Sequence, residues 1–418
     1  MLIKFLKWTE KYTKTNMLYV AKSNFWLVSG RAISIILGFG LTVAFANLLP
    51  PEKFGVYKYI VATAGIISAF SLNGMGAALL RAIGNGKKNV IPGCFKESVY
   101  WSLPASIIAI IGGIYYLFQA NFELGFSFIV IGVTNPLLTN LAISKVFFVA
   151  VGNFKLNFLL SSLRSLTQIA SIVLVLILSK NILLIVATYF IVGLIVNYII
   201  YIYSLKILSV KPDKEYVEET VNYSKHLSLL GGVQLILNQL DQILMWHFVG
   251  PSALATYAMS FGPVKELRTV GENINSMIFP KFANKTTEKL IHLLSFRVRQ
   301  LFFIYVPILI IYLFSAPFLF KFFFPQYIDA VFYSQLLATV IILQPRAVLD
   351  LLILARGDIV DRYNITIPSQ IIKIILFLVL IPLYGLIGGI IANILFEIAV
   401  ALVMGFAYRK FIKKNKLR

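Results

Sequence analysis

The chain has 418 residues, of which 59% are hydrophobic and 13% charged, and its mean hydropathy is +0.84. A soluble domain is about 45–50% apolar and about 25% charged, so this composition excludes an ordinary soluble protein and predicts an integral membrane protein. The net charge of +21 would suit nucleic acid, but the basic residues lie between long apolar runs, as membrane insertion requires. We therefore exclude nucleic acid as a partner.

The N-terminal segment, residues 1–24, is basic and mixed in polarity. Lys4, Lys7, Lys11 and Lys14 recur at helical spacing with apolar residues between them, which predicts an amphipathic helix on an anionic membrane surface. A flexible basic tail is the alternative interpretation. The segment does not have the apolar core of a cleavable signal peptide.

Long apolar segments fill most of the remaining sequence. Because a helix needs about 20 apolar residues to cross the hydrocarbon core, we predict about twelve transmembrane helices. The expected spans are Phe25–Leu49, Val56–Leu80, Ser98–Phe118, Leu124–Val149, Phe158–Leu178, Ile182–Tyr203, Leu227–Val249, Ala253–Phe279, Leu301–Phe324, Ile328–Ala355, Ile365–Leu383 and Leu386–Tyr408.

The basic residues outside these spans test the count. With the N-terminus in the cytoplasm, 28 lysines and arginines fall in cytoplasmic segments and 4 in outer ones. One missed span would exchange the two sides downstream and destroy this asymmetry, so the charges predict an even number of spans with both termini cytoplasmic.

The spans divide into two groups of six. Residues 25–204 and 226–408 form the two predicted lobes, residues 205–225 are a cytoplasmic linker, and residues 409–418 are a basic cytoplasmic tail. A shift of 200 residues places four residues over their counterparts: Pro51 over Pro251, Tyr57 over Tyr257, Asn73 over Asn273 and Arg81 over Lys281. Parallel repeats of this kind are typical of transporters.

Six basic residues fall well within the predicted spans, more than about a turn from either end, where an unpaired charge costs about 3 kcal/mol or more. They are Arg31, Arg164, Lys265, Arg268, Arg346 and Lys373. Together with polar residues at helical spacing on at least six spans, they predict a central, hydrated and mainly cationic cavity. We expect five of them to bind an anionic substrate: Arg31, Arg164, Arg268, Arg346 and Lys373.

Alternatives remain for three of these cations. Arg268 has Glu272 four residues further on, and Arg346 has Asp350 at the same spacing, so each arginine could instead form a pair that stabilises helix packing. Lys373 could extend to the membrane interface. Arg31 and Arg164 have no acidic residue within a helical turn, so a substrate role is favoured for them.

Three acids inside the spans are candidates for coupling transport to H⁺ or Na⁺: Asp241, Glu272 and Glu397. Asp241 stands out because its own helix has no nearby base, although a salt bridge to an arginine on another helix is the alternative. Gln168, Gln234, Asn238 and Gln370 are the expected polar residues of the cavity. Because Cys94 is the lone cysteine and the histidines match no metal motif, no metal site and no cofactor beyond the coupling ion is predicted.

Two sequence stretches resemble the polysaccharide flippases, the O-antigen and capsule-type exporters of the superfamily that includes the MATE drug exporters and the lipid II flippase. They are Trp26–Arg31 and the turn Leu48–Tyr57, which reads LLPPEKFGVY. The resemblance implies an all-α, MATE-like fold of two six-helix bundles related by pseudo-two-fold symmetry. It also implies that Arg31 faces the cavity and that Asp241 lies at a cation site. The apolar stretch Phe377–Leu383 departs from the pattern of the Na⁺-binding relatives.

The function implied by this resemblance is translocation of undecaprenyl-diphosphate-linked oligosaccharides, such as O-antigen units of lipopolysaccharide, by alternating access. The chain would act as a monomer, with membrane lipids, a polysaccharide polymerase and a chain-length regulator as partners. A MATE-like, cation-coupled drug exporter is the alternative, but its cavity should be acidic or apolar. A membrane enzyme is a third class, disfavoured because outer segments such as Gln119–Glu123 are short.

Overall fold

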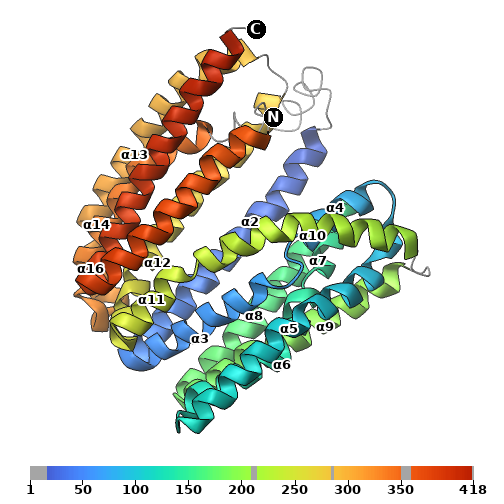
Figure 1. Ribbon diagram of the computed structural model, residues 1–418, viewed down its shortest axis with the longest axis vertical. Helices are drawn as coiled ribbons and strands as arrows, with labels where there is room; N and C mark the ends of the chain where they lie inside the picture. Colours follow the sequence, from blue (N-terminus) through green and yellow to red (C-terminus); the bar gives the residue numbers. More distant parts are fainter. Residues whose placement is uncertain (1–16, 209–213, 284–286, 350–358, 417–418) are drawn as a thin grey trace. The chain divides into compact units, whose positions relative to one another are not determined.

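The structure is a computed structural model that describes residues 17–208, 214–283, 287–349 and 359–416 (Figure 1). Within these residues all regular secondary structure is helical. The chain forms two compact units. Unit 1 comprises Met1–Leu49 and Ile60–Ile236, and unit 2 comprises Pro50–Tyr59 and Leu237–Arg418.

Unit 1 is built from eight described helices and the later part of a ninth, α3 (Pro51–Ala69). The eight are α2 (Met17–Leu48), α4 (Met75–Gly84), α5 (Ile91–Phe118), α6 (Phe122–Leu141), α7 (Ser144–Ala150), α8 (Phe154–Leu178), α9 (Ile182–Leu208) and α10 (Lys214–Leu237). The predicted linker at residues 205–225 is largely helical where described, because α9 continues into it and α10 begins in it.

Unit 2 contains the first part of α3 and the helices that follow α10. These are α11 (Leu240–Phe248), α12 (Pro251–Ala283), α13 (Thr287–Phe323), α14 (Ala330–Ala338), the 3-10 helix η3 (Thr339–Arg346) and α16 (Ile359–Lys416). The long helix α16 is two helices joined at Gly385, whose φ of 59° and ψ of −133° are accessible to glycine and not to residues with a Cβ. This bend separates the eleventh and twelfth predicted spans.

The structure confirms an all-α membrane fold, and helix occupies the described part of every predicted span. Eight segments are long and apolar enough to cross a membrane, and one of them, Val360–Lys413, covers two predicted spans. The helices in the second, seventh and eighth predicted spans are not both long and apolar enough to cross a membrane by themselves. The second and seventh are each divided into two helices, and the eighth contains the charges of Lys265, Glu266 and Arg268.

Where the second predicted span is interrupted, a polar side chain from another helix forms a hydrogen bond with the backbone. Between α3 and α4, the amide of Gly74 donates to Ser228 Oγ of α10 at 2.9 Å. Such irregular backbone is tolerated at membrane depth only where side chains or water replace the lost helical hydrogen bonds. Near the end of α6, Asn140 Nδ2 links two helices, because it donates to the carbonyl of Ser98 and to Ser102 Oγ of α5, both at 3.1 Å.

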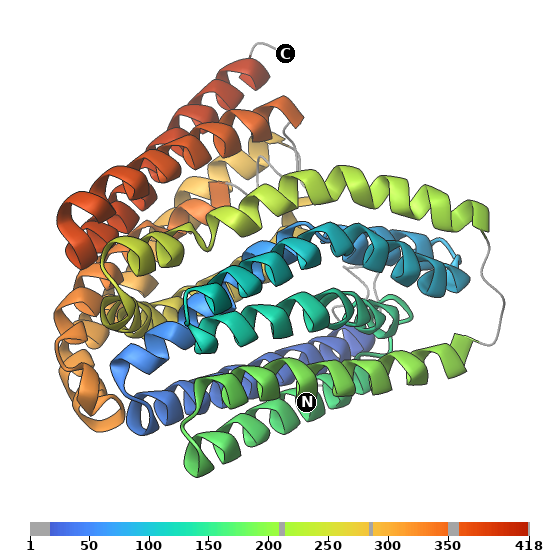
Figure 2. The same ribbon diagram turned by 60° about the horizontal axis from the view of Figure 1, so that its bottom comes forward.

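Helix α5 has a buried face of small and polar residues, whereas α13 has a row of large apolar residues on its surface. In α5 the buried face consists of Ser98, Ser102, Ala105, Ser106, Ala109 and Gly113, which allows α6 to approach closely (teal ribbons in Figures 1 and 2). By contrast, Phe314, Phe318 and Phe322 form an exposed row along α13, each at least 76% exposed. This distribution suits a lipid surround, in which helix packing depends on close contact and not on hydrophobic burial.

Two prolines that the repeat aligns begin equivalent helices. Pro51 starts α3 and Pro251 starts α12, and their first turns meet within unit 2. A Cβ at Gly55 would overlap the carbonyl group of Pro251, so only glycine permits this crossing. Tyr57 and Tyr257, one turn further along each helix, are both buried.

Candidate functional site

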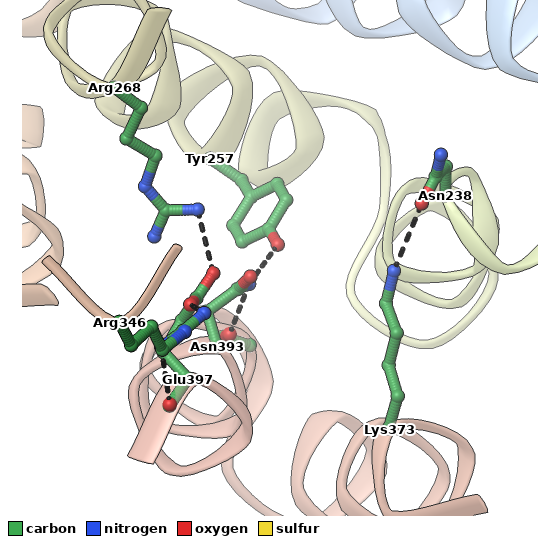
Figure 3. Close-up of polar contacts among 8 residues, drawn as sticks. Asn238, Tyr257, Arg268, Arg346, Lys373, Asn393 and Glu397 are labelled. Atoms are coloured by element: carbon green, nitrogen blue, oxygen red, sulfur yellow. Dashed lines mark hydrogen bonds and ion pairs between the residues drawn. The ribbon is translucent and has the colours of Figure 1, made fainter. Parts of the chain in front are cut away.

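Glu397 of α16 is the centre of a buried polar cluster in unit 2 (Figure 3). Its Oε1 accepts from Arg268 Nη1 of α12 at 2.8 Å, and its Oε2 is paired with Arg346 Nη2 at the end of η3. Arg346 Nη1 also donates to the backbone carbonyl of Glu397 at 2.6 Å. A single carboxylate therefore neutralises only part of the charge of two arginines.

This arrangement differs from the local pairs that helical spacing allowed. Both arginines find their acid on another helix, 129 residues away for Arg268 and 51 for Arg346. The side chain of Glu272 and the whole of Asp350, the local alternatives, lie outside the described residues. Arg268 retains two buried nitrogens, Nε and Nη2, that make no hydrogen bond to described residues, so it keeps donors for a further acceptor.

Asp241 lies at the first turn of α11 and is connected to α12 and α16 through hydrogen bonds. Tyr257 Oη donates to Asp241 Oδ2 at 2.7 Å and accepts from Asn393 Nδ2 at 2.6 Å. The backbone amide of Gln242 donates to Asp241 Oδ1 at 2.9 Å. Asn393 precedes Glu397 by one helical turn, so the two acids are linked to the same face of α16.

Lys373 is a buried cation on α16 that faces Asn238, at the junction of α10 and α11 (Figure 3). Its Nζ lies 3.5 Å from Asn238 Oδ1 and 5.5 Å from the centre of the Phe396 ring. It is also close enough to Asp241 and Glu397 to interact with both charges. Unit 2 thus brings together three of the predicted substrate-binding cations and two of the predicted coupling acids.

Unit 1 holds a second group of charges, on α7 and α8. Arg164, in the middle of α8, is half-buried, and its Nε makes no hydrogen bond to a described residue. Lys145 of α7 is also half-buried and close enough to Arg164 for their charges to repel. Among the described residues neither cation forms an ion pair.

Lys145 was not expected at a site, because it lies about a turn from the end of its predicted span and is one of the 28 basic residues counted on the cytoplasmic side. Its position inside the apolar stretch Leu124–Val149 was the signal that could have identified it. Tyr257 and Asn393 likewise gain significance only from the structure, because their hydrogen bonds join residues 16 and 136 positions apart.

The remaining predicted residues lie on α2, α8, α10 and α16. Arg31 is exposed on α2, next to Gly30, which packs against Phe158 of α8. Gln168 is buried and donates to the carbonyl of Tyr189 on α9 at 2.9 Å, which fastens two helices of unit 1. Gln234 on α10 and Gln370 on α16 are half-buried.

Comparisons of structure place this fold among known transporters. Lipid II flippase MurJ, in an inward closed conformation, matches with a TM-score of 0.70 and 15% identity over 92% of this chain and 87% of that one. An inward-facing MATE family multidrug transporter matches with a TM-score of 0.60 and 13% identity over 92% and 95%. A MOP superfamily transporter from Pyrococcus furiosus matches with a TM-score of 0.56 and 15% identity over 95% and 96%.

Comparisons of sequence point to a single family. No curated protein matches the chain. Residues 20–285, well over half of its length, match the profile of a family described as "Polysaccharide biosynthesis protein". With the whole fold shared with transporters and more than half of the sequence fitting one family, the chain belongs to the polysaccharide biosynthesis protein family.

Proposed function

We propose that the protein is a flippase that moves undecaprenyl-diphosphate-linked oligosaccharide units, such as those of O-antigen, across the bacterial cytoplasmic membrane by alternating access. It transports its substrate and does not act as an enzyme. The family supports a role in polysaccharide synthesis, and the fold shared with a lipid II flippase supports a lipid-linked cargo. The observation that carries the proposal is the pair of half-buried cations Lys145 and Arg164.

Two like charges within a membrane protein are unfavourable unless an anion accompanies them. Each would cost about 3 kcal/mol or more at the bilayer centre, and their mutual repulsion adds to this. A diphosphate supplies two negative groups close together, and a guanidinium can bind phosphate through two parallel hydrogen bonds. The linkage group of a polyprenyl-diphosphate glycan therefore matches Lys145 and Arg164 in sign and in number.

Unit 2 offers a second cationic surface. Arg268, Arg346 and Lys373 carry three positive charges, against the carboxylates of Glu397 and Asp241. Arg268 uses only part of its donor capacity within the cluster, so an anionic headgroup can bind there without displacing Glu397. A drug-cation exporter would need the opposite sign of charge at both places.

Asp241 is our candidate for coupling transport to an ion. Protonation, or binding of Na⁺, would remove its charge and weaken its attraction to Lys373. Tyr257 and Asn393 would transmit the change to α16, because their hydrogen bonds connect Asp241 to that helix. Glu272 and Glu397 remain candidates for the same role.

The test is a double substitution, Lys145→Ala with Arg164→Ala, in a strain that lacks its own flippase and depends on this chain for surface polysaccharide. Loss of charge-assisted hydrogen bonds of about 1.5–3 kcal/mol predicts at least a tenfold fall in export. The matched control is Lys155→Ala, which removes an exposed cation from the same helix α8 and should leave export unchanged.

Export at the wild-type level in the double variant, with normal amounts of protein in the membrane, would overturn the role of this pair. Unchanged polysaccharide together with a loss of drug resistance would instead favour the multidrug exporter. Arg31→Ala tests the other predicted substrate-binding cation of unit 1 in the same assay, with reduced export expected.

A further inference from the structure

A small pocket in unit 1 shares no residue with the groups described above. It opens between the end of α4 and the first half of α10, has a volume of about 80 Å³, and is lined by Arg81, Lys87, Tyr216, Glu219 and Tyr223, among others. Its position is set by the adjacent face of α10, where Val217 and Val221 are buried in one apolar cluster with Leu79 and Ile83 of α4.

Arg81 and Lys87, the two cations of the pocket, lie over aromatic rings. The guanidinium carbon of Arg81 lies 4.6 Å from the centre of the Tyr223 ring, and Lys87 Nζ lies 3.1 Å from that of Tyr216. Neither cation has an ion pair with a described residue. A ring face occupies only part of the donor capacity of a guanidinium or an ammonium, so both cations retain N–H donors for an oxyanion.

The pocket has room for a small anionic group. By the same measure a water molecule needs about 10–15 Å³, so this space holds several waters or a group the size of a phosphate. Two cations favour a phosphate. Glu219 on the same wall leaves a net charge of +1 and would repel a second negative group while attracting an amine. The three charges therefore match a phosphodiester that bears an ammonium group nearby.

Neighbouring aromatic residues favour a lipid as the source of that phosphate. Lys96 of α5 lies 5.8 Å from the Tyr100 ring, and Lys225 of α10 lies 5.1 Å from the Trp101 ring of α5, a helix that packs against α10 at Gly93 and Val217. Tyr100 and Trp101 are 55% and 48% exposed. Exposed tyrosine and tryptophan beside lysines mark the depth of lipid headgroups, and basic pockets between helices at that depth bind headgroups.

We infer that the pocket between α4 and α10 binds the headgroup of an aminophospholipid at the cytoplasmic face, with its phosphate on Arg81 and Lys87 and its ammonium on Glu219. The bound lipid would link the end of α4 to α10, which otherwise meet here through cation–ring contacts. The site is separate from the transported substrate.

The experiment measures lipid binding to the purified, delipidated full-length chain by native mass spectrometry. The probes are phosphatidylethanolamine, phosphatidylglycerol, which has no amine, and inorganic phosphate. We expect one phosphatidylethanolamine to bind in preference to phosphatidylglycerol, with inorganic phosphate unable to displace it at comparable concentration. Arg81→Ala with Lys87→Ala should weaken the binding of both lipids about tenfold or more.

The matched control is Lys96→Ala with Lys225→Ala, which removes two cations from the same end of unit 1 but outside the pocket. It should change lipid affinity by less than about twofold, since only non-specific attraction is lost. Glu219→Gln preserves size and should remove the preference for phosphatidylethanolamine while leaving lipid binding in place. Equal weakening in both double variants, or displacement by inorganic phosphate at lipid-like concentration, would overturn the assignment.

Discussion

The pairing of one carboxylate with two guanidinium groups determines how Glu397 responds to substitution. Burial removes water from the side chains of Glu397, Arg268 and Arg346. The electrostatic attraction between them compensates for this loss of hydration. Removing one partner of such a group lowers the folding stability by more than the whole group contributes to it, because an uncompensated buried charge is left behind. Glu397 is the member whose loss leaves two charges uncompensated.

Glu397→Gln should therefore destabilise the protein by about 3–5 kcal/mol, seen as a lower midpoint of thermal unfolding in detergent. Adding Arg346→Met should restore part of the loss, because one buried charge then disappears with its partner. The exposed acid Glu123 provides the control, since Glu123→Gln should leave the midpoint unchanged. A midpoint that stays the same in Glu397→Gln would contradict the arrangement in Figure 3.

At the scale of residues, the sequence identified most of the charges but few of the contacts. Arg268, Arg346, Asp241 and Glu397 stand out because each interrupts an apolar span. Their partners could not be predicted, because the pairs join helices that are distant in sequence and local spacing suggested other acids. The substrate and coupling roles assigned to these residues stay predictions.

At the scale of elements, the bend within α16 depends on a single residue. Gly385 has a backbone conformation that a residue with a Cβ adopts only with strain. Gly385→Ala should cost about 1–3 kcal/mol, measured as a lower midpoint of thermal unfolding. Gly405→Ala, in the same helix with open space around its Cβ, should be neutral or stabilising by up to about 1 kcal/mol. Equal midpoints for both variants would show that the bend does not need glycine.

The positions of the helices were largely predictable, because long apolar segments have few alternatives in a membrane. The breaks within them were not. The second, fourth and seventh predicted spans are each divided in two, at residues such as Gly74, Asn140 and Asn238 that are ordinary members of an apolar segment by composition. A helix break is tolerated where a side chain on another helix bonds the free backbone group, as Ser228 does for Gly74. A hydropathy pattern does not show which side chain on another helix will be near the break.

At the scale of the whole molecule, the unequal distribution of basic residues makes a prediction about orientation. The orientation can be measured by labelling introduced cysteines, because the only native cysteine, Cys94, is buried and should not react. A cysteine introduced at Lys180, exposed after α8, should react with a membrane-impermeant maleimide in intact cells. One introduced at Lys410, exposed near the end of α16, should react only after permeabilisation. Labelling of both in intact cells would contradict cytoplasmic termini.

The membrane class and helical fold followed from composition, apolar length and charge asymmetry, which all reflect the same requirement for insertion. The family was accessible through two short stretches, and the profile match over residues 20–285 includes both. The division into compact units was only approximately predictable. The boundary at Ile236 falls inside the seventh predicted span, where α10 ends and α11 begins, and Pro50–Tyr59 joins unit 2 although the rest of α3 belongs to unit 1.

This last feature has a mechanical consequence. The first turns of α3 are locked to the start of α12 at Gly55, with no space for even one methyl group, while its later turns pack in the other compact unit. An intact α-helix resists stretching and bends only slightly over this length. In the proposed alternating-access cycle, movement of one unit would therefore act on the other through the continuous backbone of α3.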